Sequence, residues 1–178
     1  MEPVQIVWFK RDLRLADHGP LLLASQRGPV LPLLVVEPEL WSQPDASARQ
    51  WRFYRESLLE LREELATLGQ PLVVRVGQVT AVLERIRRHW PIAGLWSHQE
   101  TGNGWTYGRD RQVAAWARQH GIVWTELPSF GVIRRLAQRD GWARRWEALM
   151  AEPLRAAPRG LRPLAGVAPG NQIGRAHV

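Results

Sequence analysis

Charged and polar side chains follow apolar runs at four places in this sequence, each where a buried strand would end. The sharpest case is the apolar run 4–9, after which Lys10, Arg11, Asp12 and Arg14 follow. Short uncharged runs of this kind are typical of parallel strands that are buried on both faces. In open parallel sheets the ligand crevice forms outside the carboxyl ends of the strands, where the winding reverses. The residues after the strands therefore predict a binding site along one edge of a sheet.

Three further connections carry polar residues directly after an apolar run, namely Glu37-Pro38, Gly77-Gln78 and residues 98–102. The last is followed by Gly104 and Gly108, and a G-x-G-x-x-x-G spacing before a helix superficially suits a pyrophosphate at the helix N-terminus. The dinucleotide fingerprint normally lies in the first βα unit, however, and no acidic residue follows here at the usual distance. We therefore do not expect a nicotinamide cofactor.

Length and composition indicate one domain with a tail. The chain has 178 residues, of which 45% are hydrophobic, and no cysteine, so disulfides, thiolate zinc sites and a cysteine nucleophile are excluded. The five histidines, at positions 18, 89, 98, 120 and 177, lack any paired ligand spacing, and we predict no metal. There is no run of 18 uncharged apolar residues and no basic-then-apolar leader, so we expect a cytoplasmic protein without a membrane span.

The positive net charge is partly an effect of the tail. The formal net charge is +7, but four arginines follow the last acidic residue, Glu152, so residues 1–152 carry only +3. Lys10 is the only lysine, and the remaining basic residues are spread along the chain. A basic domain can meet nucleic acid nonspecifically, but charge this dispersed does not favour direct DNA binding by this segment.

Five short apolar runs alternate with helical patterns. The expected strands are residues 4–9, 30–36, 72–76, 92–96 and 122–125. The expected helices are residues 21–26, 47–68, 79–90 and 105–120. Such alternation with short connections indicates a parallel sheet with helices on both faces, because each crossover returns right-handed over the sheet. We predict an α/β fold, a Rossmann-like, doubly wound three-layer α/β/α domain with a five-stranded parallel sheet.

Capping residues and composition set the expected boundaries. Asp45 or Ser47 can cap the long helix, and Gly69 and Gly121 follow helices at positions where glycine ends them. From residue 151 onward the pattern gives way to scattered Pro, Gly and Arg, with too few large apolar residues for a packed element. We therefore assign residues 1–150 to the domain and 151–178 to a linker or tail, of which residues 170–178 resemble a cloning remnant.

Three ordered motifs resemble the DNA photolyase/cryptochrome family. The first is the aromatic pair Trp8-Phe9, followed by a basic residue and Arg11-Asp12-Leu13-Arg14. The second is the segment 36–41 with the helix entry Ser47-Ala48-Arg49, and the third is Tyr107-Gly108-Arg109-Asp110 after the fourth strand. Together they cover roughly residues 4 to 150, which makes the resemblance more specific than any single motif.

The resemblance implies an N-terminal antenna domain. Family members continue through a linker into a larger helical domain that binds FAD, uses blue or near-ultraviolet light and repairs cyclobutane pyrimidine dimers in damaged DNA. That flavin domain lies outside these 178 residues, so we expect no catalytic residue here. In many members the α/β domain binds a second chromophore, namely a deazaflavin, flavin mononucleotide (FMN) or methenyl-folate, and passes excitation energy to FAD.

By the same resemblance eight residues would contact the chromophore: Arg11, Asp12, Glu37, Pro38, Glu100, Thr101, Arg109 and Asp110. Arginine could stack on the ring, and carboxylates could accept from its N–H groups. Folate is disfavoured because folate-binding relatives have a histidine where this sequence has Pro44, and the segment around Trp105 also departs from their pattern. The motif 107–110 is closer to the deazaflavin-binding members.

Each of these residues could also have a purely structural role. Arg11 and Asp12 could form a local ion pair, Asp17 could cap the first helix, and Arg109 with Asp110 could be a solvated helix face. The alternatives to an antenna domain are a cryptochrome-type photoreceptor domain, a nucleotide-binding α/β module, and a structural domain with an empty pocket. Most of the ten tryptophans are expected in the core, and an apolar patch is expected where the flavin domain would dock.

Overall fold

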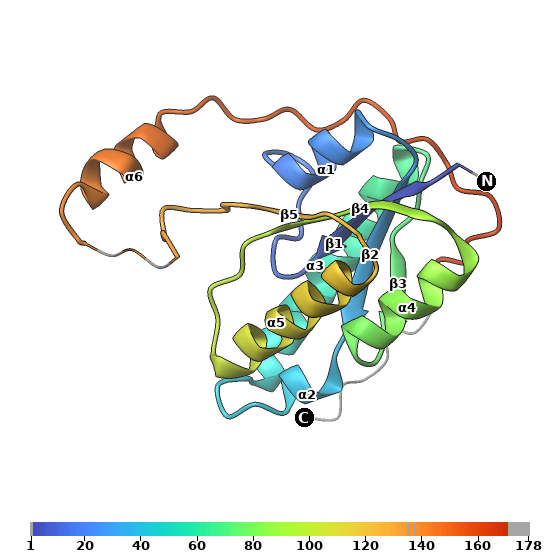
Figure 1. Ribbon diagram of the computed structural model, residues 1–178, viewed down its shortest axis with the longest axis horizontal. Helices are drawn as coiled ribbons and strands as arrows, with labels where there is room; N and C mark the ends of the chain where they lie inside the picture. Colours follow the sequence, from blue (N-terminus) through green and yellow to red (C-terminus); the bar gives the residue numbers. More distant parts are fainter. Residues whose placement is uncertain (1, 135, 137, 171–178) are drawn as a thin grey trace.

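The computed structural model describes residues 2–134, 136 and 138–170, and its centre is a five-stranded parallel sheet (Figure 1). The strands are β1 (Val4–Phe9), β2 (Val30–Val36), β3 (Val73–Val76), β4 (Ile92–His98) and β5 (Trp124–Leu127). Their order is β3-β2-β1-β4-β5, and every neighbouring pair is parallel. The winding therefore reverses between β1 and β4. This reversal is the topological switch point at which ligand crevices form in such sheets.

Helices cover both faces of the sheet, as the alternating pattern predicted. On one face α4 (Val79–His89) and α5 (Gly104–Gln119) pack on the strands, with Trp8, Leu33 and Leu95 in the buried cluster between them. On the other face α1 (Gly19–Ser25) and α3 (Ala48–Thr67) enclose a second cluster. The short α2 (Pro38–Trp41) follows β2. The doubly wound three-layer prediction is confirmed.

The core accounts for several tryptophans. Trp8, Trp51, Trp96 and Trp116 are each at most 9% exposed and belong to the two apolar clusters. Their burial on opposite faces of the sheet contributes a large share of the apolar area removed from water. Core packing is therefore the role of these four side chains.

Most element boundaries differ from the sequence prediction by one or two residues, and two of these differences concern the fourth and fifth strands. The fifth strand begins at Trp124, two residues later than expected, because the backbone N–H of Ile122 donates to Ala117 and closes the end of α5. Gly121 between them has φ +65°, the left-handed conformation that ends helices. The fourth strand extends to His98, so that its last residues reach the carboxyl edge of the sheet.

The helix caps confirm one of two alternatives and correct one expectation. Ser47 caps α3 by accepting from the N–H of Gln50, whereas Asp45 accepts from the side-chain amide of Asn103. Asp17 does not cap α1. That helix is capped by His18, whose Nδ1 accepts from the N–H of Leu21 at 3.0 Å.

Residues 153–170 contain no helix or strand, yet they lie against the domain. Leu161 is 6% exposed within the α1/α3 cluster, and its N–H donates to Leu68 at 2.7 Å. Further along, the carbonyl of Pro169 accepts from Val74 at the free edge of β3. We call residues 153–170 the strap. The strap forms no packed element, as its composition indicated, but the sequence argument did not foresee that Leu161 docks the strap on the domain.

The helix before the strap is of a different kind. Helix α6 (Trp142–Met150) was not predicted, extends away from the sheet in Figure 1, and contains no buried residue. None of the helices in the described part of the chain combines the length and apolar character that a bilayer crossing requires.

Candidate functional site

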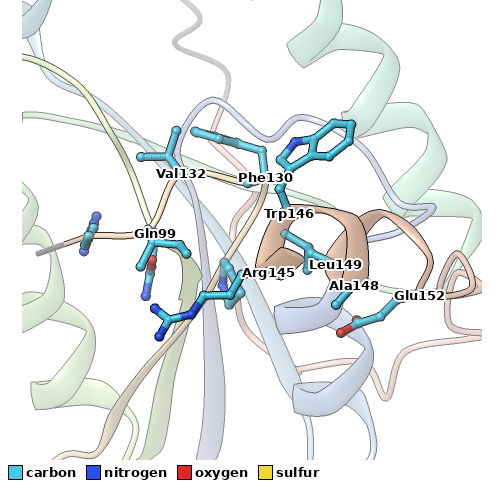
Figure 2. Close-up of a pocket in the computed structure, with 12 residues that line it drawn as sticks. Gln99, Phe130, Val132, Arg145, Trp146, Ala148, Leu149 and Glu152 are labelled. Carbon is cyan, nitrogen blue, oxygen red and sulfur yellow. The ribbon is translucent and has the colours of Figure 1, made fainter. Parts of the chain in front are cut away.

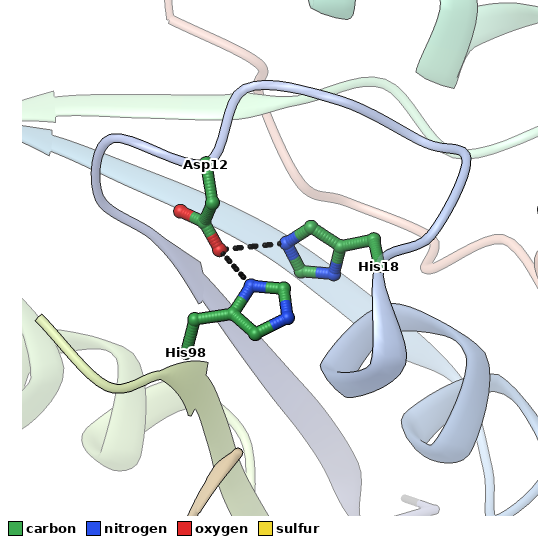
Figure 3. A group of neighbouring side chains, drawn as sticks. All are labelled: Asp12, His18 and His98. Atoms are coloured by element: carbon green, nitrogen blue, oxygen red, sulfur yellow. Dashed lines mark hydrogen bonds and ion pairs between the residues drawn. The ribbon is translucent and has the colours of Figure 1, made fainter. Parts of the chain in front are cut away.

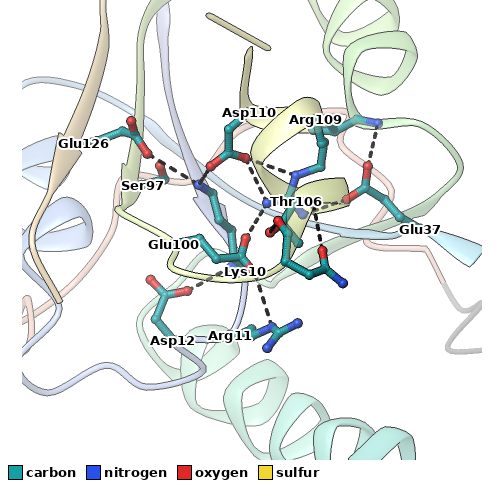
Figure 4. A network of polar contacts seen from close by, with 12 residues as sticks. Lys10, Arg11, Asp12, Glu37, Ser97, Glu100, Thr106, Arg109, Asp110 and Glu126 are labelled. Atoms are coloured by element: carbon teal, nitrogen blue, oxygen red, sulfur yellow. Dashed lines mark hydrogen bonds and ion pairs between the residues drawn. The ribbon is translucent and has the colours of Figure 1, made fainter. Parts of the chain in front are cut away.

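Arg109 is the centre of the polar residues at the carboxyl edge of the sheet (Figure 4). Asn103 fixes the start of α5 by accepting from Thr106, and Arg109 follows in the second turn with its side chain 6% exposed. Its Nη1 donates to Glu37 Oε2 at 3.0 Å, and its Nη2 donates to Glu100 Oε2. Its Nε and Nη2 also reach Asp110 Oδ1, at 3.1 and 2.9 Å. One guanidinium therefore joins three carboxylates through four hydrogen bonds, which suits its planar fork of donors.

The network continues through Lys10 toward β5. Lys10 Nζ lies 3.2 Å from Asp110 Oδ2 and 3.6 Å from Glu126, and it stands 4.5 Å from the centre of the Trp8 ring. Arg134 pairs with Glu126 at 3.1 Å and with Asp110 at 3.6 Å. Buried charges persist only when they are paired and hydrogen-bonded, and here cations and carboxylates alternate. The alternative in which Arg109 and Asp110 form a solvated helix face is excluded, because both residues are buried.

Glu100 and Arg11 border this network from the side of α3. Arg11 Nε lies 3.2 Å from Glu100 Oε1, so Arg11 pairs across the switch point rather than with Asp12. The contact lacks hydrogen-bond geometry, and Glu100 Oε1 is the one buried side-chain polar atom in the described residues without a hydrogen-bond partner. A buried carboxylate oxygen in this condition is a ready acceptor for a ligand N–H.

At both Glu37 and Arg109, burial and ion pairing shift the pKa in opposite directions. Burial raises the pKa of Glu37 above its ordinary value despite the neighbouring Arg109. Burial alone would lower the pKa of Arg109, but Glu100, Asp110 and Glu37 raise it, so the guanidinium stays charged. Glu37 Oε1 also accepts from the N–H of Val79 at the start of α4. Glu37 thus connects the end of β2 to two helices.

Asp12 belongs to a separate cluster with two histidines (Figure 3). Its Oδ2 lies 2.9 Å from His18 Nε2 and 2.6 Å from His98 Nδ1, while its Oδ1 accepts from the N–H of Lys10. Burial alone would raise the pKa of Asp12, but the hydrogen bonds from the two histidines outweigh it and hold that pKa below its usual range. The cluster fastens the β1–α1 connection to the end of β4.

The hydrogen bonding of His18 determines what this cluster can hold. Because His18 Nδ1 accepts from the N–H of Leu21, its proton resides on Nε2 and points at Asp12. A metal bound at Nε2 would displace that proton and leave an imidazolate facing the helix cap. The three ligand atoms lie within 4.8 Å of one another, but the donor pattern fits a hydrogen-bonded cluster rather than a metal site.

Three hollows border the Arg109 network. The largest, of about 620 Å³, lies on the β4–β5 side and is lined by Glu100, Asp110, Trp124 and Glu126, among others. A hollow of about 240 Å³ beside Glu37 and one of about 270 Å³ beside Arg11 lie on the β2 and α3 sides. We call them the β5 hollow, the β2 hollow and the α3 hollow. A planar chromophore therefore has room beside the network but not through its centre.

The eight residues expected at the site divide into three groups. Glu37, Glu100, Arg109 and Asp110 form one buried network, which Arg11 joins through Glu100. Asp12 lies in the histidine cluster, and Pro38 and Thr101 are exposed at the rim.

Five further residues of these clusters were not among the expected site residues: Lys10, His18, His98, Glu126 and Arg134. Of these, only Lys10 and His98 could have been found from the sequence, because Lys10 directly follows an apolar run and His98 lies at the end of another. Nothing local in the sequence singles out the other three.

An apolar hollow of about 450 Å³ lies next to this edge, between the 128–134 connection and α6 (Figure 2), and it shares Val132 and Arg134 with the β5 hollow. Phe130, Val132, Trp146 and Leu149 line it, and the first two and Trp146 are more than two-fifths exposed. Exposed apolar patches of this kind are typical of interaction surfaces in proteins.

The sequence comparisons agree with the fold and the motifs. A cryptochrome-1 from Sinapis alba is 37% identical over 86 residues, which cover 46% of this chain and 17% of the relative. A deoxyribodipyrimidine photo-lyase from Vibrio cholerae is 39% identical over 70 residues, 39% of this chain and 15% of the relative. The chain thus spans less than a fifth of the length of these relatives.

Solved structures and a family profile extend the match over the domain. A class III photolyase from Agrobacterium tumefaciens superposes with a TM-score of 0.78 at 21% identity, covering 96% of this chain and 37% of its own. A photolyase from Sulfolobus tokodaii, described with two FAD molecules, gives 0.76 at 21% identity, covering 93% and 39%. The sequence profile described as DNA photolyase matches residues 5–133. With its N-terminal-type α/β fold, the chain belongs to the DNA photolyase family.

Proposed function

We propose that this chain is the light-harvesting antenna domain of a photolyase or cryptochrome flavoprotein. The observation that carries the proposal is the carboxyl edge of the sheet, where Glu100, whose Oε1 is buried without a hydrogen-bond partner, lines a hollow of about 620 Å³. An antenna site needs a rigid pocket that orients a planar ring through a few polar contacts, and it needs no acid, base or nucleophile.

The residues at this edge fit such a chromophore. Glu100 and Asp110 offer carboxylate acceptors for ring N–H groups, and Thr101 lies at the rim. The bound chromophore would supply the light absorption and pass its excitation energy to FAD. Deazaflavin, FMN and methenyl-folate are the ligands proposed. The Sulfolobus tokodaii structure, described as implying a novel light-harvesting cofactor, supports a second chromophore in a protein of this fold.

The activity of the whole protein is also part of the proposal. The proposed partner is a C-terminal helical flavin domain of the same polypeptide, which would bind FAD and damaged DNA and cleave cyclobutane pyrimidine dimers in light. The apolar hollow beside α6 supports a docking partner on that side. A cryptochrome-type photoreceptor is the second candidate, because cryptochromes and photo-lyases are both among the relatives.

Absorption spectroscopy tests the antenna function. The chain, purified in dim light, would be scanned for a near-ultraviolet or blue band, released ligand identified by mass spectrometry, and the protein titrated with deazaflavin, FMN and methenyl-folate. We expect at least one to bind, and Glu100→Gln to weaken it while the exposed Glu39→Gln does not. A protein that binds none of the three would refute the antenna assignment and leave a structural domain.

A further inference from the structure

A further hollow, of about 380 Å³, lies at the amino edge of the sheet, opposite the Arg109 network. The first residue of β4, the last turn of α4 and the residue that ends α5 all border it. We call it the amino-edge hollow. Half of its lining residues are apolar, and the other half are arginine or histidine, namely Arg87, Arg88, His89 and His120. The hollow therefore combines positive charge with apolar surface.

The fold brings together arginines that are scattered in the sequence. The last turn of α4 carries Arg87 and Arg88, and that of the adjoining α5 carries Arg118. The only acidic residue of α4 is Glu84, which pairs with Arg87 at 2.8 Å and with Arg88 at 3.3 Å. Cations in a last turn complement the helix dipole, but one carboxylate does not balance three guanidinium groups. The ends of the two helices therefore carry excess positive charge.

Arg88 has donors left over for a ligand. Its side chain is 68% exposed, and only its Nε reaches Glu84, so both Nη groups make no ion pair or hydrogen bond with the residues that the structure describes. The exposed side chain of Arg118 likewise has no such partner in the described part of the chain. The planar fork of a guanidinium matches the oxygens of a phosphate, to which it donates two parallel hydrogen bonds.

The apolar part of the hollow suits a flat ring. Trp90 and Ile122 are half-buried and line the hollow beside the basic residues. Sites for single-stranded nucleic acid combine a basic surface that follows the phosphates with aromatic side chains on which unpaired bases stack. A duplex keeps its bases stacked inside the helix, so it would meet the arginines but not the ring of Trp90.

We propose that the amino-edge hollow binds single-stranded nucleic acid, with a phosphate at Arg88 and an unpaired base on Trp90. This contact goes beyond the proposed antenna function and does not depend on it, because the two sites lie at opposite edges of the sheet. The dispersed charge of the sequence did not favour DNA binding. The packing of α4 beside α5 changes that expectation by gathering part of the charge beside an aromatic side chain.

Fluorescence anisotropy of a labelled oligothymidylate measures the binding. We expect a Kd of about 10⁻⁴–10⁻⁶ M, the range of nonspecific binding at physiological salt, and a steep loss of affinity as salt increases. A duplex of the same length and heparin, which carries charge without bases, should both bind more weakly. Thymidine monophosphate tests whether a free nucleotide rather than a strand is the ligand, and it should bind more weakly still.

Two variants with matched controls locate the site. Arg88→Gln should weaken binding by up to about fivefold, the limit for one exposed charge pair, and reduce the salt slope by about 0.7. Arg52→Gln, which removes the same charge from the exposed face of α3, should do neither. Trp90→Leu should weaken oligothymidylate binding by about fivefold or more and leave duplex binding unchanged. Trp146→Leu, on the exposed α6, is its control.

Each result decides for or against the proposed site. No binding at low salt, equal affinity for the duplex, heparin or thymidine monophosphate, or equal effects of Arg88→Gln and Arg52→Gln would each overturn the inference. The same holds if Trp90→Leu folds by circular dichroism and binds oligothymidylate like the original chain. If Trp90→Leu does not fold, Arg88→Glu at the exposed rim takes its place and should weaken binding more than Arg88→Gln does. None of these outcomes bears on chromophore binding, which is read from the absorption spectrum.

Discussion

The guanidinium of Arg109 lies 3.0 Å from the carboxylate of Glu37, 72 residues away in the chain. The contact joins α5 to the end of β2, and Glu37 in turn accepts from the first N–H of α4. Both side chains are only 6% exposed, so if one of them is removed, water cannot solvate the charge of the other. The contact therefore connects the stability of the domain to the geometry of the proposed site.

Replacing Arg109 should destabilise the fold strongly. Arg109→Ala leaves Glu37, Glu100 and Asp110 buried without their common cation, and breaking a buried pair in this way costs about 3–5 kcal/mol. Urea unfolding followed by tryptophan fluorescence measures the change. The neighbouring Arg111→Ala serves as control and should change the free energy of unfolding by less than about 0.5 kcal/mol. Equal effects of the two variants would show that the network is not buried in solution.

The Arg109 network could be predicted from the sequence only in part. The motif 107–110 and the position of α5 were readable from the sequence, and four of the expected residues do meet in one network. Whether Arg109 faces solvent or the sheet depends on the rotation of α5 relative to Trp8 on β1, Glu37 after β2 and Glu100 after β4, which no local sequence pattern contains. The Glu126 and Arg134 contacts follow from the register of β5, and that strand was predicted two residues too early.

The Asp12 cluster should not respond to metal. Binding of Zn²⁺ by Asp12, His18 and His98 would require His18 to give up its Nε2 proton while its Nδ1 still accepts from Leu21. Thermal unfolding with Zn²⁺, and separately with EDTA, should give an unchanged Tm. The sequence also predicted no metal, but from spacing alone. A rise in Tm with Zn²⁺ that His98→Ala removes would contradict the prediction and identify a metal site.

His18 should make the protein less stable in mild acid. Burial lowers the pKa of His18 and outweighs the hydrogen bond to Asp12, which raises it. The unfolded side chain takes up a proton near its ordinary pKa of about 6.5, and the folded one does not, so the free energy of unfolding falls as pH drops below that value. From pH 6.5 to 5.5 the loss should be about 1 kcal/mol for this one group.

Urea unfolding at both pH values measures this effect. His18→Asn keeps an N-cap acceptor for Leu21 and cannot titrate, so its stability should change less over the same interval. The exposed His89→Asn is the control and should retain the acid sensitivity of the original chain. If His18→Asn loses stability in acid as steeply as the original chain does, another group carries the titration.

The strap shows a second limit of sequence reasoning. Proline and glycine content correctly indicated a segment without helices or strands, but composition does not reveal where single apolar residues fall. Leu161 enters the cluster between α1 and α3, and Leu164 and Val167 pack against the opposite cluster. Arg75 holds the end of the strap by donating to the carbonyl of Ala168 at 2.8 Å. The strap thereby covers part of the free edge of β3, and such edges otherwise invite pairing with another chain.

Removing the Leu161 side chain should reveal how much the strap stabilises the domain. Leu161→Ala creates a cavity between α1 and α3, and buried Leu→Ala changes typically cost about 2–4 kcal/mol. Leu154 lies in the strap and is 82% exposed, so Leu154→Ala should hardly change the free energy of unfolding. A difference between the two variants therefore reports the docking of Leu161 rather than the loss of a leucine from the strap. Urea unfolding gives both values, and sedimentation velocity shows whether the loosened strap lets β3 edges associate. Equal stability of the two variants would mean that the strap is not docked in solution, and the domain would then end before residue 153.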